Sequence, residues 1–149
     1  MISQSEMARL TVRLLKLKPP FVIATRRTEW QLGKSWVNVL MLSIGYKGVA
    51  IPLFWLVLEQ KGCSDNAERS AVLQQFIDEF GVSGIGFVTA DREFASKEWL
   101  KFLVGRKISF RLRIKANTTI TNKSGKPMRA SKLCRTLKTG ERVEFRQRA

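Results

Sequence analysis

The sequence predicts an α/β fold in which helices cover a mixed sheet. Residues 37–44 and 49–58 are apolar runs on either side of a glycine-containing turn, as in antiparallel strands. A third run, residues 85–90, contains Ile, Val and Thr and stops at Asp91. A helical pattern follows it, as it follows a buried parallel strand. Together these observations indicate a sheet that contains both antiparallel and parallel pairs.

The amino-terminal residues predict a short helix and a first strand. Over residues 5–17, an apolar stripe at helical spacing consists of Met7, Leu10, Leu14 and Leu17. Pro19 and Pro20 end this helix, because proline cannot continue one. Residues 21–25 form the first strand, which runs into Arg26, and a turn follows at Gly33.

Residues 45–48 predict a four-residue hairpin connection between the second and third strands. Pro52 lies in the third strand. Because proline cannot donate a hydrogen bond to a neighbouring strand, we expect the third strand at an edge of the sheet.

Two helices flank the strand at residues 85–90. Asp65 and Glu68 have the spacing of a helix start, and an apolar stripe follows until Gly81, which predicts a core helix. A second helix over residues 96–104 buries Trp99, Phe102 and Leu103. Residues 109–115 then alternate as a fifth strand, with an apolar face of Phe110, Leu112 and Ile114 and a basic face of Arg111, Arg113 and Lys115.

The order of these elements is three strands, helix, strand, helix, strand. This succession matches the ribonuclease H-like fold, an α/β fold with a mixed five-stranded sheet, flanking helices and its third strand at the edge. Asp91 then stands at the carboxyl edge of a buried strand, where α/β folds present reactive groups. The simpler interpretation is that Asp91 only caps a turn.

Composition excludes several classes of protein. The chain has 149 residues, 44% of them hydrophobic, which suits one domain with a buried core. It has no His, which excludes imidazole catalysis and His-ligated zinc. Cys63 and Cys134 are isolated, which argues against a disulfide scaffold and favours a reducing compartment. The apolar run 49–58 is shorter than the roughly 20 residues of a membrane span. We therefore expect a cytoplasmic protein with no membrane partner.

Basic residues gather outside the centre of the chain. The net charge is +15, and residues 106–149 carry fourteen Lys/Arg against two acidic residues. This excess favours a polyanionic partner, most often nucleic acid, bound with salt-sensitive affinity. The alternative for residues 115–149 is a solvated basic tail. The candidate nucleic-acid-binding residues are Arg111, Arg113, Lys115, Lys123, Lys126 and Arg129.

Five blocks of sequence, in order, carry a resemblance to a known family. They are residues 28–34, 38–42, 46–53, 90–94 and 111–115. Over roughly residues 20–117 the chain resembles the bacterial insertion-sequence transposases of the cut-and-paste DDE class, enzymes of mobile elements. Several blocks at suitable spacings make this resemblance more specific than any single motif.

The resemblance implies a ribonuclease H-like core that cleaves DNA at transposon ends and joins the freed 3′ hydroxyl to a target in DNA recombination. Two Mg²⁺ or Mn²⁺ ions, held by two Asp and one Glu, would activate the phosphate, because such ions need anionic oxygen ligands. Asp91 matches the second Asp and is thus the candidate catalytic and metal-binding residue. The implied partner is transposon-end DNA, with a homodimer as the candidate assembly.

The first Asp of the family pattern is replaced by Arg26, which Arg27 and Thr28 follow. A guanidinium stays protonated and cannot ligate a metal ion, so Arg26 would repel the ion or pair with Asp91. Glu29 is a poor substitute, because the period of two in a strand places it on the face opposite to Arg26. Glu93 corresponds to a supporting residue of the family.

The third carboxylate is also missing from the pattern. The family carries its Glu on a late helix with spaced Tyr, Arg and Lys, whereas Tyr46 is the only Tyr here, and Glu141 and Glu144 lie in a polar stretch. The resemblance therefore implies a transposase truncated at both ends. Its predicted parts are an amino-terminal helical segment, a partial core and the basic start of an insertion or tail, over residues 1–19, 20–117 and 118–149.

Three functions remain. The first is a truncated, catalytically deficient transposase. The second is a non-catalytic DNA-binding protein derived from one, in which Arg26 and Asp91 form an ion pair and the basic flanks hold phosphates. The third and weakest is an RNA-binding α/β domain, which would need an exposed aromatic platform. None is evident, because four residues are expected mostly in apolar settings: Trp30, Trp36, Trp55 and Trp99.

Overall fold

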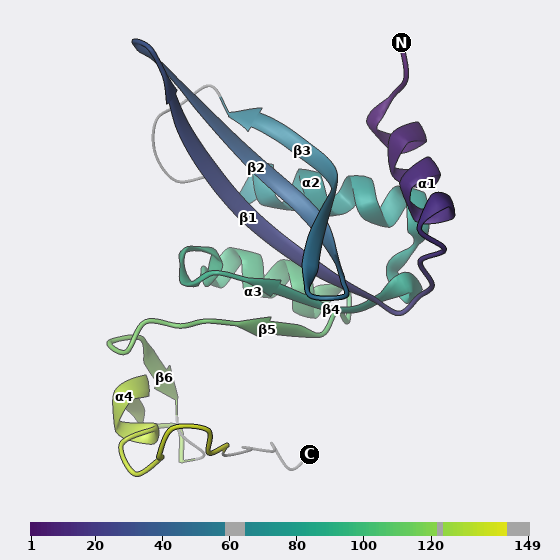
Figure 1. Cartoon of the computed structure of the whole chain (residues 1–149). Coiled ribbons are helices and arrows are strands. Elements are labelled where there is room, and N and C mark those ends of the chain that lie inside the picture. The colour runs from purple at the N-terminus through teal and green to yellow at the C-terminus, as the bar shows by residue number, and fades with distance from the viewer. Residues whose placement is uncertain (59–64, 122–123, 143–149) are drawn as a thin grey trace. The chain divides into compact units, whose positions relative to one another are not determined.

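A five-stranded mixed sheet is the centre of the computed structural model, which describes residues 1–58, 65–121 and 124–142. The strand order is β3-β2-β1-β4-β5 (Figure 1). β1, β2 and β3 pair antiparallel, whereas β1 with β4 and β4 with β5 pair parallel. The bounds are β1 Phe21–Leu32, β2 Ser35–Tyr46, β3 Val49–Leu58, β4 Ile85–Ala90 and β5 Phe110–Leu112. The predicted mixed five-stranded sheet is confirmed.

The chain divides into two units, Met1–Arg113 and Ile114–Ala149. The first holds the five-stranded sheet together with its helices. In the second, β6 (Thr119–Thr121) pairs with β7 (Pro127–Arg129), and α4 (Ala130–Leu133) follows directly. The Ala130 N–H donates to the Thr118 carbonyl at 2.8 Å, which ties the start of α4 to the residue just before β6.

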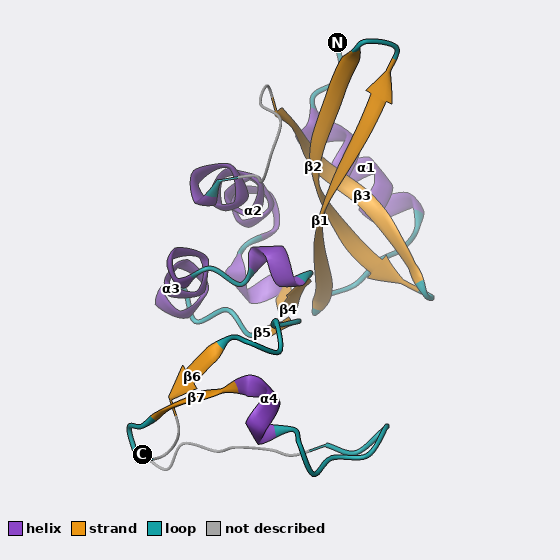
Figure 2. Cartoon of the chain, turned by 90° about the vertical axis from the view of Figure 1, so that its left-hand side faces the viewer, coloured by secondary structure: helices purple, strands orange, loops and turns teal. Residues whose placement is uncertain are grey.

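Two helices cover one face of the sheet (Figure 2). α2 (Asn66–Phe80) begins with the predicted capping box of Asp65 and Glu68 and ends at Gly81, whose φ of 77° favours glycine. α3 (Lys97–Gly105) is capped by the Ser96 hydroxyl. Short 3₁₀ turns, η1 (Val82–Gly84) and η2 (Arg92–Phe94), lead into and out of β4.

Aromatic rings fill the space between these helices and the sheet. Phe76 of α2 is fully buried and meets Phe21 of β1 and Phe54 of β3 edge-on, with ring centroids 6.1 and 6.5 Å apart. Trp99 and Leu103 of α3 are likewise fully buried. The predicted core stripe of α2 is therefore confirmed, and apolar burial of this kind supplies most of the stability of such a domain.

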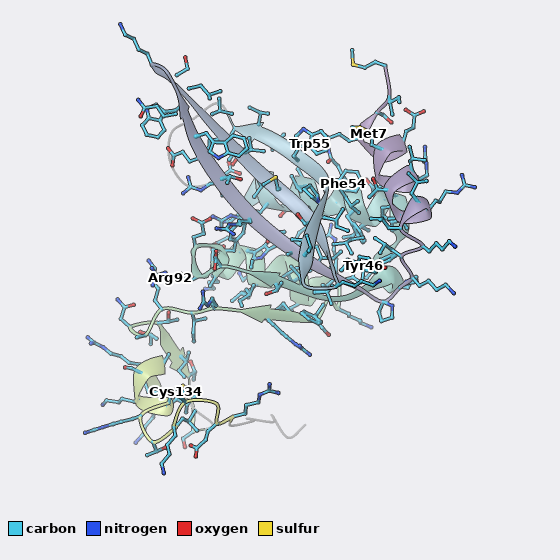
Figure 3. The ribbon with its side chains drawn as sticks, in the orientation of Figure 1. Met7, Tyr46, Phe54, Trp55, Arg92 and Cys134 are labelled. Atoms are coloured by element: carbon cyan, nitrogen blue, oxygen red, sulfur yellow. The ribbon has the colours of Figure 1, made fainter. Side chains whose placement is uncertain are left out.

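α1 (Gln4–Leu14) packs against the edge strand β3. The Gln4 side chain exchanges two hydrogen bonds with the backbone of Trp55, at 3.0 and 3.1 Å, so it occupies hydrogen-bonding groups of the edge. The predicted apolar stripe is wrong at Leu10 and Leu14 of this helix, whereas Leu17, beyond its end, is buried as predicted. Ala8 is buried instead, while Leu10 and Leu14 are 51% and 71% exposed, because the small side chain lets the helix approach closely. Figure 3 labels Met7 and Trp55 on these two elements.

β1 and β2 are longer than predicted. The strands continue pairing as far as Leu32 and Ser35, and the turn holds Gly33, whose φ is 63°. β3 pairs with β2 only from Asn38 onward. Between Asn38 and the turn at Gly33, β1 and β2 therefore form a two-stranded hairpin arm (Figure 1). The arm leaves Trp30 and Trp36 54% and 45% exposed, which corrects the expectation of apolar settings for both; Trp99 is buried.

The connection between β2 and β3 is shorter than predicted. Gly45 and Tyr46 pair with Ala50 and Val49, so only two residues, Lys47 and Gly48, form the turn. Their φ angles of 48° and 81° are both positive, as in the two-residue turns that match the twist of a hairpin. Pro52 lies on the edge strand, as predicted, beside a register shift in the β2–β3 pairing.

The fifth strand is shorter than the predicted residues 109–115. Three residues pair with β4, and the expected buried face does not form, because Phe110 and Ile114 are 37% and 48% exposed. β5 lies at the other edge of the sheet, and only Leu112 packs against the core. Among the described residues, no helix is long and apolar enough to cross a membrane.

Candidate functional site

The site lies where β1 and β4 run side by side. These strands are parallel, and their paired residues include Ala24 with Thr89 and Thr25 with Ala90. The next residues along the two strands are Arg26 and Asp91. Asp91 therefore follows the carboxyl end of β4, which is where α/β proteins build their sites, whereas Arg26 lies in the middle of β1, where its pairing with β4 ends.

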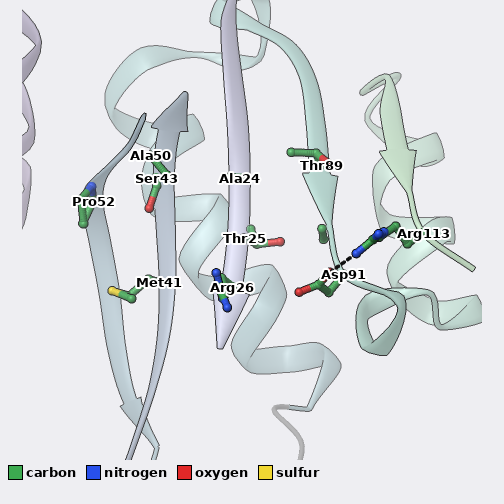
Figure 4. A pocket seen from close by; sticks show the side chains of 11 residues that line it. Ala24, Thr25, Arg26, Met41, Ser43, Ala50, Pro52, Thr89, Asp91 and Arg113 are labelled. Carbon is green, nitrogen blue, oxygen red and sulfur yellow. Dashed lines mark ion pairs between the residues drawn. The ribbon is translucent and has the colours of Figure 1, made fainter. Parts of the chain in front are cut away.

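A pocket of about 420 Å³ opens beside these two residues (Figure 4). Alanines, Met41 and Pro52 form its apolar wall. Its polar lining consists of Thr25, Arg26, Ser43, Thr89, Asp91 and Arg113. The pocket thus combines one carboxylate, two guanidinium groups and three hydroxyls.

Asp91 is held by its backbone rather than by its side chain. Its carbonyl accepts from the Phe94 N–H at 3.0 Å, which begins η2, but its carboxylate makes no cap hydrogen bond. The turn-capping interpretation therefore does not describe the carboxylate. The side chain is 53% exposed and faces the pocket.

Arg113 is the cation beside Asp91. Its Nη1 lies 3.9 Å from Asp91 Oδ1, and its side chain is 84% exposed. Solvent screens such a pair, which therefore contributes little to stability. The predicted ion pair between Arg26 and Asp91 is wrong for the described residues, because β5 lies beside β4 and brings Arg113 to the carboxylate instead.

Arg27 occupies the other side of β1. Its guanidinium reaches Glu93 at 3.4 Å and Glu29 at 3.9 Å, and its side chain is only 17% exposed. Neither glutamate lines the pocket. Glu93, two residues after Asp91, and Glu29 of β1 therefore contact Arg27 rather than the pocket.

The described residues do not fit a two-metal centre. They contain no group of three His, Cys, Asp or Glu side chains that could hold a metal ion. In the pocket a single carboxylate faces two guanidinium groups, which repel a divalent cation. The chemistry of this donor set favours an anion over Mg²⁺ or Mn²⁺.

The candidate nucleic-acid-binding residues fall in separate places. Arg111 lies in β5, and Arg113 directly follows this strand. The Arg111 guanidinium lies over the Phe87 ring, 4.0 Å from its centroid. Lys115, Lys126 and Arg129 are exposed in the unit Ile114–Ala149. Lys123 lies outside the described residues, as does Glu144.

Sequence patterns missed one further feature of the site. Thr25 is 5% exposed, and its hydroxyl has no hydrogen-bond partner within the described part of the chain. A threonine in the middle of an apolar strand gives no sequence signal of this kind, since β-branched residues are common there.

Comparison with family models decides the family. Residues 19–148 match the model of the transposase DDE domain. This chain belongs to the DDE transposase domain family. The resemblance inferred from the five sequence blocks is thereby confirmed, and so is the link to DNA transposition that defines the family. A comparison with curated proteins gave no match.

One solved structure agrees with the fold of this DDE domain. A chain of the simian T-cell lymphotropic virus intasome, solved with the PP2A regulatory subunit B56 gamma, has a TM-score of 0.51 and 14% identity, over 68% of this chain and 37% of that chain. The dimeric HTLV-2 integrase catalytic core in complex with magnesium has a TM-score of 0.48 and 15% identity, over 64% and 62%. The DDE domain thus spans less than two thirds of these chains, and the likeness shows the fold alone.

Proposed function

We propose that this DDE domain protein binds DNA in transposition and that its own pocket does not cleave DNA. One observation carries the proposal: Arg26 follows the last β1 residue that pairs with β4 and stands next to Asp91 at the carboxyl end of β4, where a metal centre needs a second carboxylate. Family membership supports the DNA partner, and the net charge of +15 supports affinity for its backbone.

The family uses divalent metal ions, so cleavage here would require carboxylates from outside the described residues. Asp91 is the residue that would join them, because its carboxylate is exposed in the pocket. The metal would be Mg²⁺ or Mn²⁺, as the family resemblance implies. In the proposed function, Asp91, beside Arg26 and Arg113, does not bind the metal ion without those further carboxylates.

The proposal extends to three finer points that family resemblance suggests. The DNA partner is a transposon end, the assembly is a homodimer, and the location is the cytoplasm. The exposed free thiol of Cys134 suits a reducing compartment of that kind. Light scattering of the protein with and without a duplex tests the assembly.

Nicking of supercoiled plasmid, measured beside a gel-shift titration of duplex DNA, tests the proposal. Wild-type protein with Mg²⁺ or Mn²⁺ should shift DNA at low salt and leave the plasmid uncut. The matched control is Asp91→Ala, which should leave the plasmid uncut, as wild type does. Nicking by wild type that Asp91→Ala abolishes would show a working centre, and no DNA binding at low salt would remove the DNA-binding function.

A further inference from the structure

We propose that the pocket beside the middle of β1 and the carboxyl end of β4 is a phosphate-binding site, which seats a backbone phosphate of DNA on Arg26 and Arg113. The inference rests on the proposed DNA-binding function and names what the pocket holds there. In this proposal an anion site stands where the family resemblance implies a metal centre.

Charge is the first argument. Arg26 and Arg113 line the pocket with two positive charges, whereas Asp91 supplies one negative charge. The pocket therefore keeps an excess positive charge after the Arg113–Asp91 pair is counted. A guanidinium fork also matches two oxygens of a phosphate at once, which a compact ammonium does not.

The freedom of Arg113 is the second argument. Its contact with Asp91 is long, at 3.9 Å, and both side chains are more than half exposed. Because water screens such a pair, it costs little to redirect the guanidinium toward a phosphate. Asp91 then limits how tightly the site holds an anion, so that the phosphate exchanges readily.

Unused hydroxyls are the third argument. The Thr25 hydroxyl is buried and finds no hydrogen-bond partner within the described residues, and in Figure 4 the side chain points from β1 toward β4. Leaving a buried hydroxyl unpaired is unfavourable, but its oxygen is closed to solvent, so a phosphate reaches it only after the side chain turns toward the pocket. Ser43 and Thr89 add two more hydroxyls to the lining.

Size is the fourth argument. A volume of about 420 Å³ lies within the range of small-molecule pockets, roughly 300–1,000 Å³, and accommodates a phosphodiester with its adjoining sugar carbons. The apolar wall, which includes Met41 and Pro52, suits those sugar carbons. Free phosphate and DNA share the same chemistry, so the experiment must separate them.

The test measures the affinity of a duplex by fluorescence anisotropy across a range of salt, with EDTA present to exclude metal ions. Arg26→Ala and Arg113→Ala should each weaken binding roughly tenfold at low salt and lower the slope of log affinity against log salt by about 0.9, the loss of one phosphate contact. Arg26→Lys should keep the slope but lose part of the affinity, because it keeps the charge and loses the fork.

The matched control is Arg13→Ala, which removes an exposed arginine from the last turn of α1. It should change the slope far less than either pocket variant. Thermal unfolding of all four variants should match wild type. Pocket variants that change slope and affinity no more than Arg13→Ala would overturn the inference and leave DNA binding standing.

A titration with pyrophosphate separates failure of the inference from failure of the proposed function. Amide signals of Thr25, Thr89 and Ala90 should shift in wild type and stay still in Arg26→Ala. If wild type binds no DNA but these signals respond, the DNA function fails and the phosphate site stands. If they do not respond and the pocket variants leave DNA affinity unchanged, the phosphate site is wrong. Pyrophosphate binding without any effect of the variants on DNA affinity would remove DNA as the source of the phosphate.

Discussion

Two regions of the molecule follow the family pattern to different degrees. One is the core between α2 and the sheet, and the other is the pocket beside β1 and β4. In the core, Phe76 meets Phe21 and Phe54, and the elements take the order expected of a ribonuclease H-like fold. In the pocket, Arg26 stands where the family resemblance implies a carboxylate. The difference teaches that the fold forms without the full set of charged side chains on which the metal chemistry depends.

The largest effect should come from the core. Phe76→Ala removes a fully buried ring that joins β1, β3 and α2, and we expect a loss of about 3–5 kcal/mol of unfolding free energy. Urea denaturation followed by tryptophan fluorescence measures it. Phe110→Ala is the matched control, because that ring is 37% exposed and should cost far less. Equal losses would mean that the fold does not depend on this core.

Two arginines at the site should differ in the next largest effect. Arg27→Met breaks contacts to Glu29 and Glu93 from a side chain that is 17% exposed, and should cost about 1–2 kcal/mol. Arg113→Met breaks one exposed contact and should cost at most about 0.5 kcal/mol. Chemical denaturation of the two variants in parallel compares them. A larger cost for Arg113→Met would give the pocket a structural role.

The start of α2 should contribute less. Asp65 accepts the Glu68 N–H at 2.7 Å, and Asp65→Ala should cost about 1 kcal/mol by removing this cap. Asp65→Asn is the control, since an amide oxygen can still cap, and it should retain most of the stability. Thermal unfolding of both variants distinguishes capping from a general effect of charge.

The smallest effect should be a pH dependence at α1. Hydrogen bonds from the Ser3 backbone and side chain lower the pKa of Glu6 below its ordinary value, with a smaller contribution from Arg9. Because the folded-state pKa is depressed, the capping box stabilises α1 above the ordinary pKa and is lost as the pH falls through the lowered one. Carbon chemical shifts of Glu6 measure this pKa. A value at or above that of an unfolded peptide would contradict the assignment.

Local signals in the sequence were enough for much of the fold. The capping box at Asp65, the strand that stops at Asp91 and the edge position implied by Pro52 are all present as predicted. Each depends on residues that lie within a few positions of one another, where backbone sterics and hydrogen bonding decide the outcome.

Features that depend on distant contacts could not be predicted in the same way. α1 buries Ala8 rather than Leu10 because the helix packs closely against β3. Arg113 reaches Asp91 only because β5 lies beside β4, and a basic strand face does not reveal which of its residues has an acidic neighbour. The position of Asp91 directly after a buried strand was enough to predict it as a site residue. Its ion pair with Arg113 depends on tertiary structure and could not be predicted.

The most direct test of the charge reversal in the pocket is isothermal titration of Mn²⁺ into wild type, Arg26→Asp and the double variant Arg26→Asp with Asp91→Ala. Wild type should show no specific binding, because its pocket holds one carboxylate beside two guanidinium groups. Arg26→Asp should gain Mn²⁺ binding that the double variant loses, since the two carboxylates would then lie side by side on β1 and after β4. Specific Mn²⁺ binding by wild type that Asp91→Ala abolishes would contradict the account.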